Sequence, residues 1–428
     1  MRQYRIRGKS RIAGQICVGG SKNAVLPILA AVCLNKGESV IHNCPRIADT
    51  FLSIEILRHI GCRVEFYENT LWVDASGVHE INIPKKWVGK MRSSILFMGA
   101  MLGRAGEVNI ALPGGCDIGE RAIGFHLDGL KAMGATIELE NKVLHCTGPI
   151  RGADIRLESA SVGATENLML AGILAKGQTT ISNAAKEPEV IDLARFLQGM
   201  GADIRGAGTE KITIYGVTQL TNTTHCVIPD RIVAGTYMVA AAMTGGDINI
   251  VDIKPQDVAT VSVKLKQMGC EIGYGTNNVT VKGPGRLKAL PYLETGEFPG
   301  FPTDMQAQFV AALSVAEGNS LVKERIFDSR DAHAVGLKSM GADIDVFNTA
   351  VCDETQKGIT IFEIKGVPNL TGAEVEAKDL RGGAALILAG LAAGGETIVK
   401  NTSYVERGYE HIEKDLTSLG ADVRLETV

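Results

Sequence analysis

The chain of 428 residues has no long hydrophobic run and no excess of charge of either sign. Its longest apolar stretches, residues 24–34 and 384–393, are too short to cross a bilayer, and its basic start leads into no signal-peptide core. Lys and Arg number 44 against 48 Asp and Glu, a net charge of −4, which argues against nucleic acid or an anionic membrane as a partner. We therefore expect a globular, cytosolic protein.

Signatures of metal, disulfide and nucleotide-cofactor chemistry are also missing. The nine cysteines include no Cys-x-x-Cys pair, and the two His-Cys dipeptides lack the spacing of a zinc site, so we expect reduced thiols that are mostly packed. There is no Walker motif, no G-x-G-x-x-G after a strand, no G-x-S-x-G elbow and no H-E-x-x-H pair. Of the isolated histidines His126, His333 and His411, only His126 is expected to be more than a surface residue. We expect no cofactor and no metal.

Glycine, in contrast, is abundant, with 50 residues, and much of it belongs to an internal repeat. A segment close to Leu-x-x-Met-Gly, followed by alternating apolar residues, occurs six times at intervals of 67 to 79 residues. The pattern predicts in each repeat an amphipathic helix that ends at a left-handed glycine and leads directly into a strand. These glycines are Gly61, Gly134, Gly201, Gly269, Gly341 and Gly420.

A second shared element lies upstream of each of these segments, an apolar helix that is expected to end in glycine and to run into a strand. The strands alternate apolar and polar residues, so each sheet should have one wet face, whereas helices that are apolar nearly all round are buried. The sequence therefore predicts an inside-out α/β fold, with the helices inside and the sheets outside. The glycines of this element are Gly37, Gly106, Gly177, Gly246, Gly318 and Gly395.

The repeats also predict the domain organisation. Five of them continue into two more strand-like pieces that the sixth lacks, and residues 4–18 have the matching pattern, so we expect the N-terminus to complete the last repeat. Three repeats per domain give one domain of residues 22–229 and a second, discontinuous domain of residues 1–21 and 230–428. We expect the active site in the cleft between the two domains, where ligand sites are commonly found.

Polar residues stand out where they open the apolar helices. They occupy equivalent positions in the repeats, so we expect the weakly positive helix N-termini to converge, with Lys and Arg beside them, on a multiply charged anionic substrate. Ordinary helix capping and surface ion pairing would account for the same residues about equally well. The residues are Lys22, Asn23, Arg92, Ser93, Ser94, Thr165, Glu166, Asn167, Arg231, Asp304, Gln306 and Arg381.

Residues 112–121 break the repeat pattern, with three glycines around Cys116. We interpret this segment as a mobile lid. A cation at Arg121 and an expected helix start follow Cys116, and both features lower the pKa of a thiol. Cys116 is therefore the expected reactive cysteine, whereas Cys62 and Cys270 are expected to fill small buried slots.

Eight motifs spread over essentially the full length resemble the UDP-N-acetylglucosamine 1-carboxyvinyltransferases, the enolpyruvyl transferases that open peptidoglycan synthesis. Several of them are not shared with the related transferases of the shikimate pathway, so the resemblance is specific, and it too implies a two-domain inside-out α/β fold. The motifs are Gly20-Ser-Lys-Asn-Ala-Val-Leu-Pro-Ile, Met91-Arg-Ser-Ser, Leu112-Pro-Gly-Gly-Cys-Asp-Ile-Gly-Glu-Arg, Ser161-Val-Gly-Ala-Thr-Glu-Asn, Glu187-Pro-Glu, Pro229-Asp-Arg-Ile, Gly300-Phe-Pro-Thr-Asp-Met-Gln and Glu406-Arg-Gly-Tyr.

The resemblance implies an activity. The enolpyruvyl group of phosphoenolpyruvate would be transferred to the 3-hydroxyl of UDP-N-acetylglucosamine with release of phosphate, the first committed step of peptidoglycan precursor synthesis. The two small molecules would be the partners of the protein, and no metal is required because a carbon–oxygen bond breaks rather than a bond at phosphorus. The resemblance further implies that epoxides of the fosfomycin type alkylate Cys116.

The resemblance also implies residue roles. Cys116 would be the acid that protonates the enol methylene, and Asp304 would be the base for the sugar hydroxyl. Lys22, Arg121 and Arg407 would hold the phosphate and carboxylate of phosphoenolpyruvate, and Arg330 and Arg381 would assist. The residues implied to hold the nucleotide sugar are Asn23, Arg92, Ser161, Val162, Asp304 and Ile326. Further substrate-binding residues are expected at Ala122, Ile123, Gly124, Phe125 and Gly163.

The sequence departs from the family pattern at three places. Ser159 replaces a Lys of some members, Phe298 replaces the usual His before Pro-Gly-Phe-Pro, and residues 329–333 read Ser-Arg-Asp-Ala-His. A second interpretation is therefore a silent paralogue that binds the nucleotide sugar as a regulator, although the retained Cys116 and Asp304 argue against it. Transfer to another acceptor, such as shikimate 3-phosphate, is the weaker alternative because the motifs of that family are absent.

Overall fold

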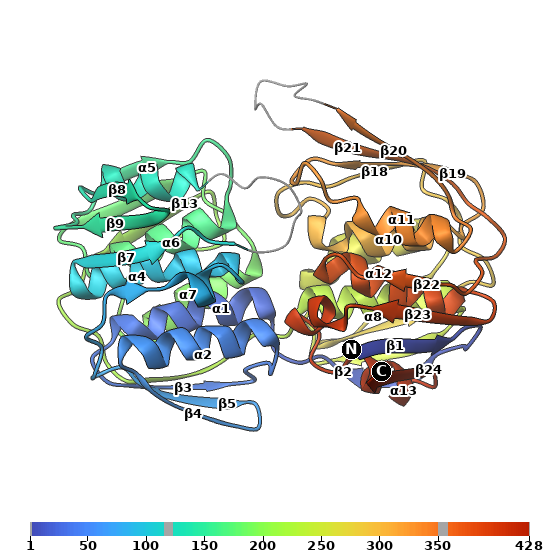
Figure 1. Ribbon diagram of the computed structural model, residues 1–428, viewed down its shortest axis with the longest axis horizontal. Helices are drawn as coiled ribbons and strands as arrows, with labels where there is room; N and C mark the ends of the chain where they lie inside the picture. The colour runs from blue at the N-terminus through green and yellow to red at the C-terminus, as the bar shows by residue number, and fades with distance from the viewer. Residues whose placement is uncertain (1, 115–122, 350–357, 428) are drawn as a thin grey trace. The chain divides into compact units, whose positions relative to one another are not determined.

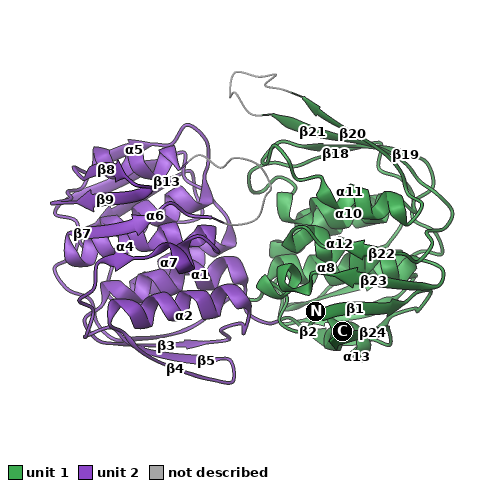
Figure 2. Cartoon of the chain, viewed as in Figure 1, with its two compact units in different colours: residues 1–18, 116–121, 229–428 green, residues 19–115, 122–228 purple. Residues whose placement is uncertain are grey.

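The computed structural model describes residues 2–114, 123–349 and 358–427 (Figure 1). The described residues form two compact units (Figure 2). One unit combines the residues up to Val18 with those from Pro229 onward, and the other runs from Gly19 to Ile228. The chain thus passes between the units after Val18 and after Ile228, whereas the repeat pattern predicts the passages after residues 21 and 229.

The unit of residues 19–228 contains three four-stranded sheets in its described part, ordered β14-β3-β5-β4, β6-β7-β9-β8 and β10-β11-β13-β12. Its strands are β3 (Glu38–His42), β4 (Arg63–Tyr67), β5 (Thr70–Asp74), β6 (Asn82–Ile83), β7 (Glu107–Ala111), β8 (Thr136–Glu140), β9 (Val143–Thr147), β10 (Asp154–Arg156), β11 (Gln178–Ser182), β12 (Asp203–Arg205), β13 (Lys211–Tyr215) and β14 (Thr223–Cys226). Its helices are α1 (Lys22–Ala31), η1 (Val32–Leu34), α2 (Ala48–Ile60), α3 (Lys85–Val88), η2 (Arg92–Ile95), α4 (Leu96–Ala105), α5 (Gly124–Ala132), α6 (Val162–Gly172) and α7 (Pro188–Gly199).

The other unit has the same plan among its described residues, with sheets ordered β22-β23-β1-β24, β16-β17-β15-β2 and β18-β19-β21-β20. Its strands are β1 (Arg2–Arg7), β2 (Ala13–Cys17), β15 (Asp247–Val251), β16 (Glu271–Tyr274), β17 (Asn278–Lys282), β18 (Tyr292–Glu294), β19 (Asn319–Glu324), β20 (Asp343–Thr349), β21 (Ile359–Lys365), β22 (Glu374–Glu376), β23 (Glu396–Lys400) and β24 (Asp422–Thr427). Its helices are α8 (Arg231–Thr244), η3 (Pro255–Val258), α9 (Ala259–Gln267), η4 (Thr303–Met305), α10 (Gln306–Leu313), α11 (Ala332–Ser339), α12 (Leu380–Ala392), η5 (Thr402–Arg407) and α13 (Ile412–Ser418).

Each sheet takes one parallel edge strand from a neighbouring repeat. In the first unit β6 pairs with β7, β10 pairs with β11, and β14 of the third repeat returns to β3 of the first. The last pairing closes the three repeats into a ring. In the second unit β2 closes the ring on β15, while β1 pairs with both β23 and β24 of the sixth repeat. The prediction that the N-terminus completes the last repeat is confirmed.

The first helix of each repeat lies in the core of its unit. Helices α1, α4 and α6 contact one another in one unit, and α8, α10 and α12 do so in the other. Every residue of α12 from Leu380 to Leu391 is buried, whereas strands such as β13 alternate between buried and more exposed residues. The inside-out arrangement predicted from the sequence is confirmed. Among the described residues, no helix is both long enough and apolar enough to span a membrane.

The two sets of glycines behave differently. The six that follow the amphipathic helices all adopt positive φ, from 91° to 111°, as the sequence predicts. The second set was expected to end the apolar helices, but only Gly106 does so directly, at the end of α4. Helix α8 ends at Gly245 rather than Gly246, and α6 ends at Gly172, before Gly177. The expectation was wrong there because apolar sequence marks burial, and the turns that follow the helices are buried as well.

Helices α4 and α6 approach so closely that Gly99 leaves no space for a side chain. A Cβ on Gly99 would lie 2.3 Å from the backbone oxygen of Asn167 and 2.5 Å from its Oδ1. We expect Gly99→Ala to lower the free energy of unfolding by about 1–3 kcal/mol, although alanine is the better helix former. Urea unfolding measures the change.

The matched control is Gly103→Ala in the same helix. There the nearest atom to the new Cβ would be a methyl carbon of Leu34 at 3.2 Å, which can move. We expect this variant to be as stable as the parent or slightly more stable. A Gly99→Ala variant no less stable than Gly103→Ala would show that the approach of the two helices does not limit the core.

Candidate active site

Three charged residues of the predicted site meet in the unit that contains α8, α10 and α12. Oδ1 of Asp304 accepts a hydrogen bond from Nη2 of Arg330 at 2.9 Å. Oδ2 of Asp304 accepts hydrogen bonds from Nη2 and Nε of Arg381 at 3.0 and 3.3 Å. The side chains of Arg330 and Arg381 are 4% and 1% exposed, and that of Asp304 is 24% exposed. One carboxylate therefore faces two buried guanidinium groups.

This arrangement sets the ionisation of Asp304. Burial alone would raise the pKa of its carboxyl, but the charges of Arg381 and Arg330 and their hydrogen bonds outweigh burial and hold the pKa well below its usual range. Asp304 is thus a carboxylate at neutral pH. Two guanidinium groups share this one carboxylate, and Asp230 also interacts electrostatically with Arg381. The fixed guanidinium groups suit an anionic ligand.

Local sequence places these groups at two adjoining helix starts. Asp304 lies in the η4 turn that opens α10. Asp379 is the N-cap of α12, where its Oδ1 accepts hydrogen bonds from the backbone N–H groups of Arg381 and Gly382 at 3.0 and 2.9 Å. The cap fixes the first turn of α12 and hence the position of the Cα–Cβ bond of Arg381. At the other end of this side chain, Cζ lies 5.4 Å from the centroid of the Tyr409 ring.

Two more predicted residues belong to this unit. Ile326 follows β19 in a turn, and its own backbone N–H donates a hydrogen bond to Oε1 of Glu324 at 2.7 Å. Arg407 is half-buried and ends η5, which packs against α12.

In the unit of residues 19–228, Lys22 opens α1 beneath the N-cap Ser21. Nζ of Lys22 lies 2.7 Å from Oδ2 of Asp49 on α2, and these side chains are 11% and 1% exposed. Asn23 follows Lys22 in the first turn. The ion pair with Asp49 holds the Lys22 ammonium in one position, where it can also bind an anionic ligand.

Arg92 and His126 form a second group in this unit. Asn167 of α6 donates a hydrogen bond from Nδ2 to Nδ1 of His126 at 3.0 Å, while its Oδ1 accepts from the backbone N–H of Gly99 at 2.8 Å. Burial and, to a smaller extent, the charge of Arg92 lower the pKa of His126 to about 3. Burial also lowers the pKa of the Arg92 guanidinium. His126 is therefore a neutral imidazole with its proton on Nε2.

The remaining predicted residues of this unit surround His126 or open α6. A Cβ built on Gly163 would lie 3.3 Å from Cε1 of His126. Ser161 is the N-cap of α6, and its hydroxyl oxygen accepts from the backbone N–H of Ala164 at 3.3 Å. The other members are Val162 at the first position of α6, Ile123 at the N-cap of α5, and Gly124 and Phe125 in the first turn of α5.

Three expectations fall on residues that the structure does not describe. Cys116, Arg121 and Ala122 lie outside the described residues, so the lid and the reactive thiol stay predictions. The expected burial of Cys62 and Cys270 is confirmed, since each is 6% exposed. Burial raises the pKa of the Cys270 thiol to about 12.

Several polar residues lie deeper than the sequence suggests. Glu166 and Gln306 were expected at helix starts open to a ligand, yet they are 4% and 0% exposed. Burial, together with the charges of Glu189 and Glu187, raises the pKa of the Glu166 carboxyl well above its usual range. His333, expected at the surface, is 2% exposed and packs against Phe362. These expectations were wrong because sequence position along a helix does not show which neighbours cover it.

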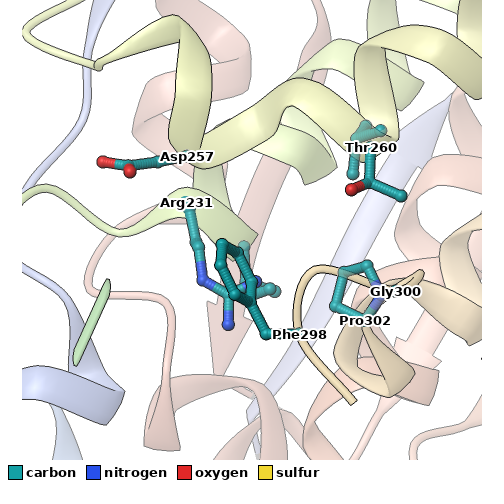
Figure 3. A pocket seen from close by; sticks show the side chains of 8 residues that line it. Arg231, Asp257, Thr260, Phe298, Gly300 and Pro302 are labelled. Atoms are coloured by element: carbon teal, nitrogen blue, oxygen red, sulfur yellow. The ribbon is translucent and has the colours of Figure 1, made fainter. Parts of the chain in front are cut away.

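A small pocket lies beside Arg231, at the start of α8 (Figure 3). Its volume of about 10 Å³ holds roughly one water molecule. The guanidinium Cζ of Arg231 lies 5.8 Å from the ring centroid of Phe298, the residue that replaces the usual histidine. A cavity of about 10 Å³ is too small for a sugar nucleotide.

Sequence reasoning missed Asp49 and Glu324. Asp49 is an acid in the first turn of a helix, which normally signals only favourable helix electrostatics. Glu324 ends an alternating strand and is 0% exposed. The one indication in the sequence was the charge of Glu324 itself, at a strand position where the alternation requires a buried side chain.

Comparison with known proteins agrees with this fold. A family model described as EPSP synthase (3-phosphoshikimate 1-carboxyvinyltransferase) matches residues 6–416. The crystal structure of the enolpyruvyl transferase NikO from Streptomyces tendae is similar over 100% of this chain and 99% of that one, with a TM-score of 0.84 and 25% identity. EPSP synthase from Acinetobacter baumannii shares the fold, with a TM-score of 0.71 at 21% identity and full coverage of both chains. The protein is thus an enzyme of the 1-carboxyvinyltransferase, or enolpyruvyl transferase, class.

Sequence relatives narrow the class. UDP-N-acetylglucosamine 1-carboxyvinyltransferase 2 of Caldanaerobacter subterraneus subsp. tengcongensis is 49% identical over 99% of both chains. UDP-N-acetylglucosamine 1-carboxyvinyltransferase 1 of Symbiobacterium thermophilum is 47% identical over 98% of this chain and 94% of its own. The enzyme of that name from Halorhodospira halophila is 42% identical over 99% of both. The chain belongs to the family of the UDP-N-acetylglucosamine 1-carboxyvinyltransferases.

The buried histidines make stability depend on pH. Burial lowers the pKa of His126 to about 3 and that of His333 to about 4, whereas each titrates near 6.5 in the unfolded chain. Below about pH 6.5 the unfolded state therefore binds more protons, and the free energy of unfolding falls as the pH falls. We expect His126→Gln to reduce this slope by up to about 1.4 kcal/mol per pH unit between pH 6 and 4.5.

Urea unfolding at several pH values measures the slope. His411→Gln, which alters a histidine with a side chain 48% exposed, is the control and should leave the slope nearly unchanged. If His126→Gln kept the parent slope, His126 would have to be protonated in the folded protein.

Proposed function

We propose that this protein transfers the enolpyruvyl group of phosphoenolpyruvate to the 3-hydroxyl of UDP-N-acetylglucosamine and releases phosphate. The reaction is the first committed step of peptidoglycan precursor synthesis. The observation that carries the proposal is the Asp304 carboxylate between the guanidinium groups of Arg330 and Arg381, in a chain of this family. The names of the three relatives support the choice of substrates.

Cations on both units would bind the substrates. Lys22, Arg121 and Arg407 hold the phosphate and carboxylate of phosphoenolpyruvate in this proposal, and Lys22 brings an ammonium already fixed by Asp49. Arg330 and Arg381 assist. The nucleotide sugar is held by the residues around Arg92 and His126 together with Asp304 and Ile326.

The chemistry needs a group for the hydroxyl proton and an acid for the enol methylene. Asp304 accepts the hydrogen bond of the 3-hydroxyl and takes its proton as the new carbon–oxygen bond forms. Because two arginines lower its pKa, Asp304 is a weak base until the hydroxyl replaces one of those contacts. Cys116 delivers a proton to the methylene carbon as the hydroxyl oxygen bonds to the adjacent carbon. Phosphate then leaves from that adjacent carbon while the new methyl group gives up a proton, which restores the carbon–carbon double bond. The fixed cations stabilise the leaving phosphate.

The proposed substrates also bear on location. Phosphoenolpyruvate and nucleotide sugars are metabolites of the cytoplasm, so we place the proposed reaction there. Two alternatives are tested by the same assay, a silent paralogue that binds the nucleotide sugar and a transferase for another acceptor such as shikimate 3-phosphate.

We expect the purified protein to release phosphate from phosphoenolpyruvate only when UDP-N-acetylglucosamine is present. Mass spectrometry should show that the sugar nucleotide gains an enolpyruvyl ether. Turnover with shikimate 3-phosphate instead would favour the other acceptor. Binding of UDP-N-acetylglucosamine without turnover would favour the silent paralogue.

We expect Asp304→Asn to bind both substrates and to lose turnover by about a hundredfold to ten-thousandfold, the usual contribution of a placed base. Equilibrium binding and initial rates measure the two effects separately. Asp345→Asn in β20, whose side chain is 73% exposed, is the control and should keep the parent rate. An active Asp304→Asn variant would remove Asp304 from this role.

A further inference from the structure

Glu324 is a buried carboxylate that the proposed chemistry does not use. It ends β19 and is 0% exposed. Oε1 accepts hydrogen bonds from the Thr295 hydroxyl at 2.9 Å and from the backbone N–H groups of Ile326 and Phe327 at 2.7 and 3.2 Å. Oε2 accepts from the Thr303 hydroxyl at 2.9 Å. Burying a carboxylate costs free energy, which points to a role for Glu324 beyond ending β19.

The hydrogen bonds of Thr303 connect Glu324 to Asp304. The Thr303 hydroxyl has one proton, which it donates to Glu324, and its oxygen accepts from Nη1 of Arg330 at 2.7 Å. Nη2 of Arg330 in turn donates to Asp304 at 2.9 Å. The directions are fixed because a guanidinium can only donate, so the Thr303 oxygen accepts from Arg330 and its one proton goes to Glu324.

The same carboxylate also fixes the turn that carries Ile326. Because Oε1 receives the backbone N–H of Ile326 and Oε2 receives the hydroxyl of Thr303, one side chain sets the distance between the η4 turn and the turn after β19. Thr303 is the residue directly before Asp304. A shift at Glu324 would therefore move both the Arg330 fork and the Asp304 backbone.

We propose that Glu324, acting through Thr303, is a positioning residue that holds Arg330, Asp304 and the Ile326 turn in the geometry required for transfer. This inference rests on the proposed function for its kinetic consequence, although the hydrogen-bonded chain itself does not. Glu324 touches no substrate in this proposal. Its effect is on the rate of the chemical step more than on substrate affinity.

Thr303→Val tests the link without touching a carboxylate or an arginine. Valine keeps the shape of threonine and removes the hydroxyl that joins Glu324 to Arg330. We expect kcat to fall by about ten- to a hundredfold, as for a small misplacement of reacting groups, with KM for both substrates changing less. Thr303→Ser, which restores the hydroxyl, should regain most of kcat.

Thr295→Val is the matched control. Thr295 is 2% exposed and donates to the same carboxylate at 2.9 Å, while its oxygen accepts from the backbone N–H of Arg325 at 3.0 Å rather than from Arg330. We expect it to lower the midpoint of unfolding about as much as Thr303→Val does, with kcat within about threefold of the parent. Glu324→Gln places an amide N–H against the Thr303 hydroxyl and should lower kcat as Thr303→Val does. It replaces Thr303→Val in the test if Thr303→Val does not fold.

A double-mutant cycle gives a readout that is independent of activity. Arg330→Lys keeps the charge but cannot bond Thr303 and Asp304 at once. In urea unfolding, the midpoint shifts of Thr303→Val and Arg330→Lys should combine to less than their sum, while those of Thr295→Val and Arg330→Lys should be closer to additive.

Additive midpoints for Thr303→Val with Arg330→Lys, or a kcat of Thr303→Val no lower than that of Thr295→Val, would overturn the proposal. Failure of the proposed function looks different. In that case the parent protein itself forms no product from the two substrates, and the unfolding cycle still decides whether Thr303 and Arg330 are linked.

Discussion

Helices that are apolar on every side cannot be left in contact with water, and the rest of this structure follows from that constraint. Each unit surrounds three such helices with three sheets, and each sheet takes its edge strand from a neighbouring repeat. The last edge strand must return to the first repeat, as β14 does to β3 and β2 does to β15. The second unit is therefore built from both ends of the chain, because its ring closes only when the N-terminal strands join it.

The same packing brings charged groups together. Since α10 and α12 lie against each other, the residues that open them meet, and Asp304 is placed between Arg381 and Arg330. Burying two guanidinium groups is costly, and one carboxylate only partly compensates for it. A multiply charged anionic substrate would supply the missing negative charge. Guanidinium groups fixed in this way suit the cluster to a transferase acting on phosphorylated substrates.

The sequence predicted much of the fold and part of the site. The six left-handed glycines, the buried helices and the place of the N-terminal strand were correct, since each depends on a local pattern that recurs. The ends of the apolar helices were less accurate, as at Gly246 and Gly177, because burial continues beyond the helix. Gln306 and Glu166 were assigned to open helix starts but are buried, because packing rather than position along the helix decides their exposure.

By itself, the sequence determined the repeat, the burial pattern, the family and the identity of most candidate residues, because these depend on residue type and spacing. Only the tertiary structure decided which charges share a contact. Asp304 and Arg381 are 77 residues apart in the chain. The partners of Asp49 and Glu324 could not be identified before the structure brought them together. The physical reason is that the ionisation of a buried group and the direction of its hydrogen bonds depend on neighbours supplied by packing, which no local pattern specifies.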